Sequence, residues 1–170
     1  MSDPVLETPR LILRELEPDD LQPLHQILGD PETMRFYPHP FSRRETAAWI
    51  ERNQERYAAH GFGLWALHLK ETGALVGDCG LTYQDVDGVS ELEVGYHVRR
   101  SLWRQGLATE AALACRDHAF GPVGASKLIA LVRVENIPSA GVARNLGMTV
   151  EGETMRAGFR HHVFATHRPG

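Results

Sequence analysis

The alternation of apolar and polar positions predicts strands over much of the chain. The clearest case is residues 91–98, where Glu91, Glu93, Gly95 and His97 fall on one face and Leu92, Val94, Tyr96 and Val98 on the other. Apolar and β-branched runs predict further strands at 11–14, 62–69, 74–82, 127–132, 149–155 and 159–166. Turns at 71–73, 85–90 and 157–158 are too short for crossovers, so the strands they join should be antiparallel.

Helices are predicted between these strands, at 18–28, 42–60, 107–120 and 138–146. Pro18 suits a first helical turn, and Ser42 with Glu45 forms a capping box. The helix at 107–120 places Leu107, Ala111, Ala114, Cys115 and His118 on one stripe. The order is one strand, two helices, three strands, a helix, a strand, a helix and two strands, which predicts an α/β (α+β) fold.

Composition narrows the function classes. The 170 residues are 42% apolar and 24% charged, without repeats or linkers, and we expect a single domain over 1–170. No apolar run approaches a membrane span and the N-terminus lacks a signal-peptide pattern, so we expect no membrane partner and a cytoplasmic location. The net charge of −4, from 18 basic and 22 acidic residues, argues against direct nucleic-acid binding. The nine histidines have no metal-ligand spacing, and we expect no metal.

The strongest chemical signal is the segment Arg104-Gln105-Gly106-Leu107-Ala108-Thr109-Glu110, which connects the strand ending at Val98 to a helix. A glycine-bearing turn at a helix N-terminus presents free backbone N–H groups and the positive end of the helix dipole to a phosphate. Arg99, Arg100 and Arg104 add positive charge. The alternative is a plain strand–loop–helix connection with solvated arginines. The segment matches neither the P-loop nor the dinucleotide-binding pattern, so ATP and NAD are disfavoured.

Trp103-Arg104-Gln105-Gly106-Leu107-Ala108-Thr109-Glu110-Ala111 resembles the acetyl-CoA-binding segment of GNAT N-acetyltransferases, and more narrowly the branch that acetylates the N-terminal residue of ribosomal proteins. The same branch is matched by Thr8-Pro9-Arg10-Leu11-Ile12-Leu13-Arg14, by Asp30-Pro31-Glu32-Thr33-Met34 and by Glu91-Leu92-Glu93-Val94-Gly95-Tyr96. It is also matched by Glu135-Asn136-Ile137-Pro138-Ser139 and by Asn145-Leu146-Gly147-Met148. Two positions depart from the superfamily. Trp103 opens the phosphate segment, and Ala143 stands where many members carry the tyrosine that protonates the leaving thiolate.

The resemblance implies a mixed, mostly antiparallel sheet of about seven strands, in which the strand ending at Val98 and the strand at 127–132 splay apart. It further implies that acetyl-CoA binds in this gap as a cosubstrate. The residues implied to bind it are Tyr96, Val98, Arg104, Gln105, Gly106, Leu107, Ala108, Thr109, Asn136 and Ser139. A backbone N–H near Val94 to Tyr96 would face the thioester carbonyl.

Glu93 is the first candidate for the base that removes the proton of an ammonium, with His97 on the same face as the second. The alternative for Glu93 is a solvated residue paired across the sheet. By resemblance Ser139 lies near the sulfur, although Asn136 and Ser139 could simply cap a helix. Cys79 and Cys115 raise a ping-pong alternative, but Cys115 lies on an apolar stripe.

Together these features predict direct acetyl transfer to a primary amine, most readily the N-terminal α-amino group of a protein such as a ribosomal protein. The pKa of an α-amino group lies about 2.6 units below that of a lysine side chain, so it is more easily freed of its proton near neutral pH. An enzyme with one carboxylate base and no tyrosine acid therefore suits an α-amino acceptor better than a lysine. The alternatives are a small amine such as a polyamine or aminoglycoside, a bulkier acyl group, and a CoA-binding module without catalysis. A monomer and a homodimer are both compatible with the sequence.

Overall fold

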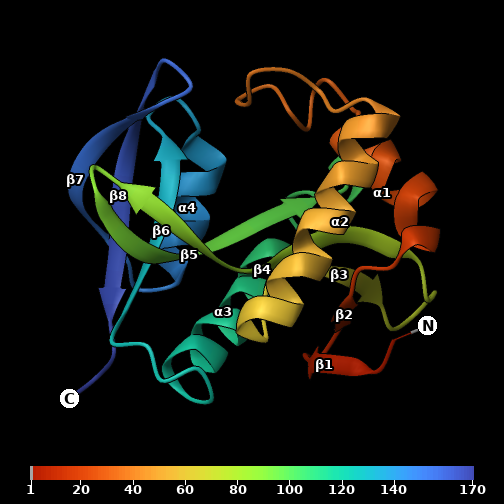
Figure 1. The fold of residues 1–170 in the computed structure, drawn as a ribbon, viewed down its shortest axis with the longest axis horizontal. Coiled ribbons are helices and arrows are strands. Elements are labelled where there is room, and N and C mark those ends of the chain that lie inside the picture. Colours follow the sequence, from red (N-terminus) through yellow and green to blue (C-terminus); the bar gives the residue numbers. More distant parts are fainter. Residues whose placement is uncertain (1) are drawn as a thin grey trace.

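The computed structural model describes residues 2–170 and contains one eight-stranded sheet with helices on both faces (Figure 1). The strands are β1 (Pro4–Glu7), β2 (Leu11–Glu15), β3 (Leu64–Leu69), β4 (Leu75–Val86), β5 (Val89–Val98), β6 (Lys127–Arg133), β7 (Thr149–Arg156) and β8 (Phe159–His167). The helices are α1 (Leu21–Leu28), α2 (Arg43–His60), α3 (Leu107–Phe120) and α4 (Ile137–Asn145), with 3-10 turns at Pro18–Asp20 and Arg100–Leu102.

The strand order is β1-β2-β3-β4-β5-β6-β8-β7, and every neighbouring pair is antiparallel except β5 and β6. The predicted mixed, mostly antiparallel sheet is therefore confirmed. The predicted number of about seven strands is wrong, because β1 adds an eighth at the edge next to β2. Its four residues, which begin with a proline, are too few to show an alternating pattern.

The β4–β5 hairpin is longer than the sequence predicted. The loop was expected at 85–90, but the strands continue to Val86 and Val89. Asp87 and Gly88 alone form the turn, both in the left-handed region with φ of 51° and 88°, as a two-residue hairpin loop requires. The pairing along this hairpin has no register shift. Successive side chains of β5 therefore alternate strictly between the two faces of the sheet.

The predicted helices are present, with small corrections. Pro18–Asp20 is a 3-10 turn and the α-helix begins only at Leu21. The capping box of α2 forms as predicted: the Ser42 hydroxyl accepts the N–H of Glu45 at 3.1 Å, and the Glu45 carboxylate accepts that of Ser42 at 2.9 Å. The predicted stripe of α3 is partly wrong, because Ala114 and His118 are only half-buried. The buried residues of α3 are Leu107, Ala111, Ala112, Cys115 and Ala119.

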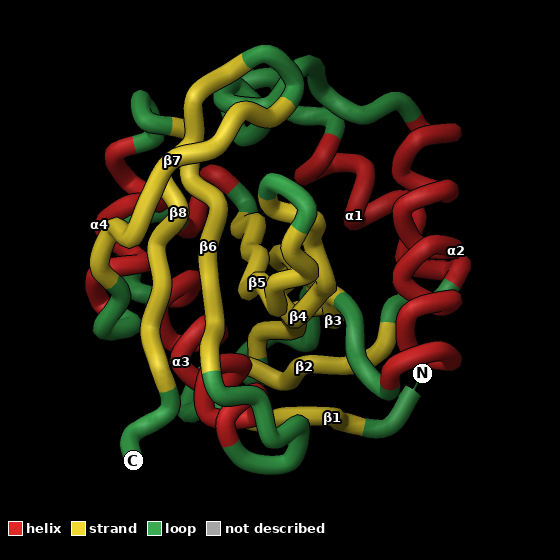
Figure 2. Tube along the Cα trace, turned by 60° about the vertical axis from the view of Figure 1, so that its left-hand side comes forward, coloured by secondary structure: helices red, strands yellow, loops and turns green. Residues whose placement is uncertain are grey.

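Two hydrophobic cores hold the helices against the sheet. The larger core packs α3 and α4 on one face, through residues such as Cys115 and Ala143. The smaller packs α1 and α2 on the other, through residues such as Leu24 and Ile50. Figure 2 shows that β1–β5 and β6–β8 form two groups of strands that diverge from one another.

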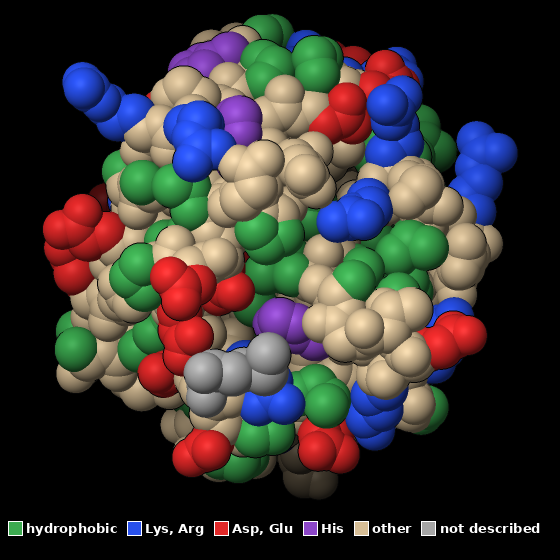
Figure 3. Space-filling view, turned by 90° about the vertical axis from the view of Figure 1, so that its right-hand side faces the viewer, with side chains coloured by type: hydrophobic (Ala, Val, Ile, Leu, Met, Phe, Trp, Pro, Cys, Tyr) green, Lys and Arg blue, Asp and Glu red, His purple; other side chains and the backbone are tan. Residues whose placement is uncertain are grey.

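The outer face over α1 and α2 exposes both basic and acidic side chains (Figure 3). Within residues 2–170, no helix is sufficiently long and apolar to cross a membrane.

Candidate active site

The loop before α3 has the backbone geometry of an anion-binding turn. Gly106 is the residue that precedes the helix, and its φ of 80° lies in the left-handed region. Arg104 also has a positive φ, of 65°. No side chain caps the N-terminus of α3. The N–H groups of residues 107–109 therefore have no intrahelical acceptor and remain available for a ligand.

A network that the sequence did not reveal holds this loop in place. Arg10 donates from Nη1 to the backbone oxygen of Gln105 at 2.8 Å. Glu110, in the first turn of α3, accepts from the backbone N–H and Nε of Arg10, both at 2.8 Å, and from the Thr8 hydroxyl at 2.6 Å. Thr8 and Arg10 lie about 100 positions before Glu110, so no local pattern connects them with it. The one sequence signal for them was that they lie in the N-terminal segment that resembles the GNAT family.

The predicted gap between β5 and β6 is present. The two parallel strands share one register pair, Glu93 with Ile129, and no pair beyond it. A groove of about 880 Å³ opens beside the end of β5, between the turn into α3 and residues 135–145. Its lining includes every predicted cofactor residue except Gln105, namely Tyr96, Val98, Arg104, Gly106, Leu107, Ala108, Thr109, Asn136 and Ser139.

The edge of β5 that faces this groove keeps part of its backbone free. Arg99 donates its N–H to Val76 of β4, and backbone direction alternates along a strand, so the N–H and C=O of Tyr96 and Val98 point toward β6. The carbonyl of Val98 already accepts the indole N–H of Trp103 at 2.7 Å. The Val98 N–H and the Tyr96 backbone are thus the groups that an amide-bearing ligand can reach.

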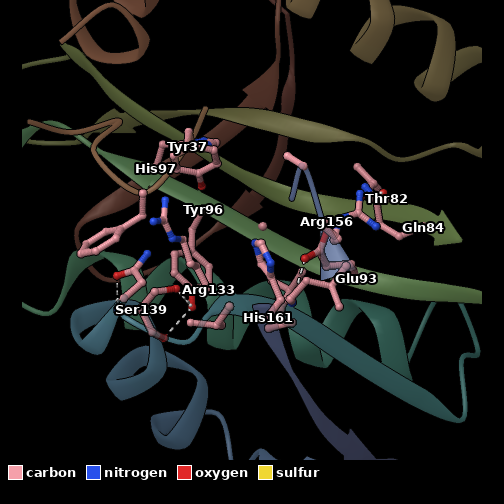
Figure 4. A pocket seen from close by; sticks show the side chains of 18 of the residues that line it. Tyr37, Thr82, Gln84, Glu93, Tyr96, His97, Arg133, Ser139, Arg156 and His161 are labelled. Carbon is pink, nitrogen blue, oxygen red and sulfur yellow. Dashed lines mark hydrogen bonds between the residues drawn. The ribbon is translucent and has the colours of Figure 1, made fainter. Parts of the chain in front are cut away.

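A second cavity, of about 390 Å³, lies beside the groove. The two share the residues Phe36, Tyr37, Tyr96, His97, Asn136 and Ser139. Figure 4 shows Ser139 and Tyr96 toward one end of this cavity and Glu93, with Arg156 and Gln84, toward the other. A ligand in the groove and a second molecule in the cavity would therefore meet around Tyr96 and Ser139.

Glu93 lines the smaller cavity, and its carboxylate accepts the N–H of Leu131 at 2.9 Å. That N–H belongs to β6 two residues beyond the last pair with β5, so the side chain takes the place of the missing strand partner. Burial raises the pKa of Glu93 to about 7, although the Leu131 N–H and the nearby Arg156 and Arg56 favour the ionised form. A carboxyl with this pKa exchanges protons near neutral pH.

His97 faces the same cavity as part of a buried pair. Its Nδ1 lies 2.7 Å from Asp78, whose carboxylate is fully buried and also accepts the Trp49 indole N–H at 2.9 Å. In the neutral imidazole this bond assigns the proton to Nδ1. Nε2 is buried, has no partner among residues 2–170, and keeps its lone pair. The structure thus brings both candidate bases, Glu93 and His97, to one cavity.

Ser139 is held at the junction by two neighbours. Its N–H is capped by the Asn136 side chain at 3.2 Å. The hydroxyl of Tyr96 lies 3.0 Å from the Ser139 hydroxyl and donates to the Ser139 carbonyl at 2.9 Å. Burial raises the pKa of Tyr96. Ala143, which stands where many members of the resembling family carry a tyrosine, is fully buried. At this junction the phenol is therefore that of Tyr96 on β5, and α4 supplies none.

Comparison with known proteins agrees with this geometry. The sequence model of the acetyltransferase (GNAT) domain matches residues 10–149. The chain belongs to the GNAT acetyltransferase family. It is an acetyl-CoA-dependent N-acetyltransferase, which confirms the resemblance seen in the sequence.

Two curated relatives and one solved structure illustrate this kinship. The acetyltransferase is 35% identical to the uncharacterized protein YkkB of Bacillus subtilis, over 84% of each chain. It is 30% identical to the spermidine N(1)-acetyltransferase of Escherichia coli, over 86% of this chain and 77% of the relative. The structure of RimL, a ribosomal L7/L12 alpha-N-protein acetyltransferase in complex with coenzyme A, has the same fold, with a TM-score of 0.76, 18% identity and coverage of 97% and 98%.

The two cysteines of the acetyltransferase lie in the core, away from both cavities. Cys79 and Cys115 are fully buried, and their sulfur atoms are 3.7 Å apart without a disulfide. Burial raises the pKa of the Cys79 thiol well above its usual value, which disfavours the thiolate that covalent catalysis needs. Among residues 2–170, no group of three or more histidine, cysteine or acidic side chains is arranged to hold a metal ion.

Proposed function

We propose that this acetyltransferase transfers the acetyl group directly from acetyl-CoA to the α-amino group at the N-terminus of a peptide or protein. One observation carries the proposal: a carboxyl with a pKa of about 7, Glu93, lines the cavity that meets the groove at Tyr96 and Ser139. An α-amino group titrates at about 7.7–8.0. Its proton can therefore pass to Glu93 at little cost, whereas a lysine ammonium would hold it more strongly.

Successive parts of the groove would bind the pyrophosphate, the pantetheine arm and the thioester of acetyl-CoA, mainly through backbone groups. The N–H groups at the N-terminus of α3, residues 106–109, would bind the pyrophosphate, with Arg104 and Gln105 beside them. The pantetheine arm would pair with the free edge of β5 at Tyr96 and Val98, and Asn136 would contact it from α4. This places the thioester near Ser139, where the groove meets the cavity.

In the proposed reaction the acceptor nitrogen attacks the thioester carbonyl, and a C–N bond forms as the C–S bond breaks. The proton of the ammonium passes to Glu93, directly or through a water molecule. The departing sulfur receives a hydrogen bond from the Ser139 hydroxyl, which turns its proton from Tyr96 to the sulfur while the phenol keeps its bond to the Ser139 carbonyl. A thiol has a pKa of about 8.5, so it can leave as a thiolate without a stronger acid. Neither cysteine is needed.

The second candidate acceptor is a polyamine, favoured by the 30% identity to spermidine N(1)-acetyltransferase. The fold similarity to RimL, which acts on a ribosomal protein N-terminus, supports the first candidate.

A direct test offers acetyl-CoA with each of three acceptors: a short peptide with a free N-terminal serine, an N-acetylated peptide containing lysine, and spermidine. Mass spectrometry of the products locates the acetyl group. We expect modification of the free N-terminus at the highest kcat/KM. Exclusive modification of lysine or of spermidine would contradict the proposal.

A further inference from the structure

The cavity beside Glu93 contains an unusual number of guanidinium groups. Arg52 and Arg56 reach it from α2, Arg133 from β6 and Arg156 from β7. Glu93 is the one carboxylate among its lining residues. The protein as a whole carries more acidic than basic residues, and its outer face over α1 and α2 shows charges of both signs (Figure 3). The excess of arginine over carboxylate in this cavity is therefore a local feature of the protein.

Two of these arginines bond to neutral groups. Arg156 donates to the side-chain oxygen of Gln84 at 2.9 Å and to a backbone oxygen, that of Asp85, at 3.4 Å. Arg56 donates to the Asn53 side-chain oxygen at 3.0 Å. Within residues 2–170, neither of them forms an ion pair with a carboxylate.

The other two arginines, Arg52 and Arg133, differ in their interactions. Arg52 lies over the Trp49 ring at 5.7 Å and likewise forms no ion pair within the described residues. Arg133 is paired with Glu135 at 2.9 Å and stacks on the Phe159 ring at 3.6 Å. Within the described residues, three of the four guanidinium groups thus form no direct ion pair, and Glu93 is the one carboxylate that lines the cavity with them.

Arg56 and Arg156 are half-buried, whereas Arg52 is exposed, so a guanidinium without a direct ion pair is costly mainly at the first two. Burial, and then repulsion from the neighbouring Arg52, lower the pKa of Arg56. An anion between the arginines would relieve this repulsion, and the planar guanidinium fork fits a carboxylate through two parallel hydrogen bonds. A polyamine would instead bring further positive charge.

We propose that Arg52, Arg56 and Arg156 bind a carboxylate of the acceptor, so that the preferred substrates carry this anion close to the primary amine. In a peptide, an acidic side chain at the second position supplies it. This inference rests on the proposed function, because it assumes that the amine reaches Glu93 through this cavity. Figure 4 shows Arg156 next to Glu93, so the anion and the amine would be bound side by side.

The arrangement also couples recognition to catalysis. Arg156 and Arg56 stabilise the ionised form of Glu93 in the free protein. An acceptor carboxylate that pairs with them would weaken this stabilisation and raise the pKa of Glu93, which makes the carboxylate a stronger base when a correct acceptor is bound. A neutral or basic acceptor would not have this effect.

The test compares three peptides that differ only at the second residue: Ser-Glu, Ser-Gln and Ser-Lys, the last with its lysine side chain dimethylated. Free glutamate and spermidine are tested as further acceptors. The wild type should acetylate Ser-Glu with a kcat/KM at least about tenfold above Ser-Lys, with Ser-Gln between them. In the double variant Arg52→Gln/Arg56→Gln, and separately in Arg156→Gln, this ratio should fall toward one. Arg44→Gln, on the same helix but outside the cavity, should keep the wild-type ratio.

The outcomes separate this inference from the proposed function. If free glutamate is acetylated but no peptide is, and the arginine variants lose this acetylation of glutamate, the anion site is supported and the peptide assignment is overturned. Equal rates for the three peptides, an unchanged preference in the arginine variants, or faster acetylation of spermidine than of every anionic acceptor would overturn the anion site itself.

Discussion

Glu93 has a structural role that the fold shows and a chemical role that we propose. It satisfies the Leu131 N–H at the point where β5 and β6 diverge, and it lines the cavity where the acceptor amine is proposed to bind. A glutamine at this position keeps an oxygen acceptor for Leu131 but cannot take up a proton. The substitution Glu93→Gln therefore separates the two tasks.

Glu93→Gln should lower kcat/KM at pH 7 by about 10²–10⁴. In the wild type the rate should rise with pH through about 7, because the ionised form of Glu93 is the base and its pKa is about 7. In the variant only the neutral amine reacts, so the rise should shift to the amine pKa of about 7.7–8.0 and the deficit should narrow at high pH.

The matched control is Glu91→Gln, two residues earlier on the same face of β5, where the side chain pairs with Lys127 outside both cavities. It should keep the wild-type profile. A Glu93→Gln enzyme with the wild-type rate and profile would assign the role of base to His97, which lines the same cavity, or to solvent.

The buried cysteines allow a separate check on covalent catalysis. Cys79 and Cys115 should not react with a thiol reagent until the protein is unfolded by urea, because both are fully buried. Intact-mass measurement after incubation with acetyl-CoA alone should show no added acetyl group. An acetylated enzyme that passes its acetyl group to an amine added later would contradict direct transfer.

Among the elements, the turn that leads into α3 should control cofactor affinity. Gly106→Glu would place a negative charge about 5 Å from the proposed pyrophosphate, a repulsion of about 3 kcal/mol at an effective dielectric constant of 20. The expected loss of CoA affinity, measured by titration calorimetry, is about 100-fold or more. Gly106 has room for a side chain, since an added Cβ would first meet Arg10 at 3.5 Å.

Gly124→Glu provides the control for backbone strain. Gly124 also has a left-handed conformation, with φ of 76°, and no atom lies within 4 Å of an added Cβ. Both variants should lose similar stability, but only Gly106→Glu should lose CoA binding. Equal CoA affinity in the two variants would exclude this turn as the phosphate site.

The elements that the sequence predicted are those defined by local pattern. The capping box at Ser42 and the phosphate turn at Gly106 were found because their signals lie within a few residues. Strict alternation along β5 placed Glu93 and His97 on one face, since no bulge interrupts its pairing with β4. The strand β1 was missed because four residues do not show a periodicity.

The residues of the site that the sequence analysis did not find depend on contacts between distant segments of the chain. The pair of Arg10 with Glu110 and that of Asp78 with His97 join residues that no local pattern connects. The same is true of Arg52 and Arg156, which reach one cavity from α2 and β7. The sequence therefore named most residues that line the proposed cofactor groove, and Glu93 and His97 on the proposed acceptor side, while the arginines of that side were missed.

At the scale of the whole molecule, acetyl transfer is proposed to occur where the groove formed by β5, the turn into α3 and α4 meets the smaller cavity, around Tyr96 and Ser139. The smaller cavity is lined by both β5 and β6, and the pair of Glu93 with Ile129 marks the last point at which the two strands are paired. A ligand that spans the junction should gain from both sides at once.

The most direct measurement is the affinity of a conjugate in which the sulfur of CoA is joined through an acetyl bridge to the α-nitrogen of a Ser-Glu peptide. By calorimetry the conjugate should bind at least about 100-fold more tightly than CoA alone, because it resembles the state in which both substrates have met. The gain should fall by about tenfold in Arg52→Gln/Arg56→Gln, because the anion site is lost, whereas CoA affinity should not change. A conjugate that binds no more tightly than CoA would show that the two cavities do not meet at a transfer site.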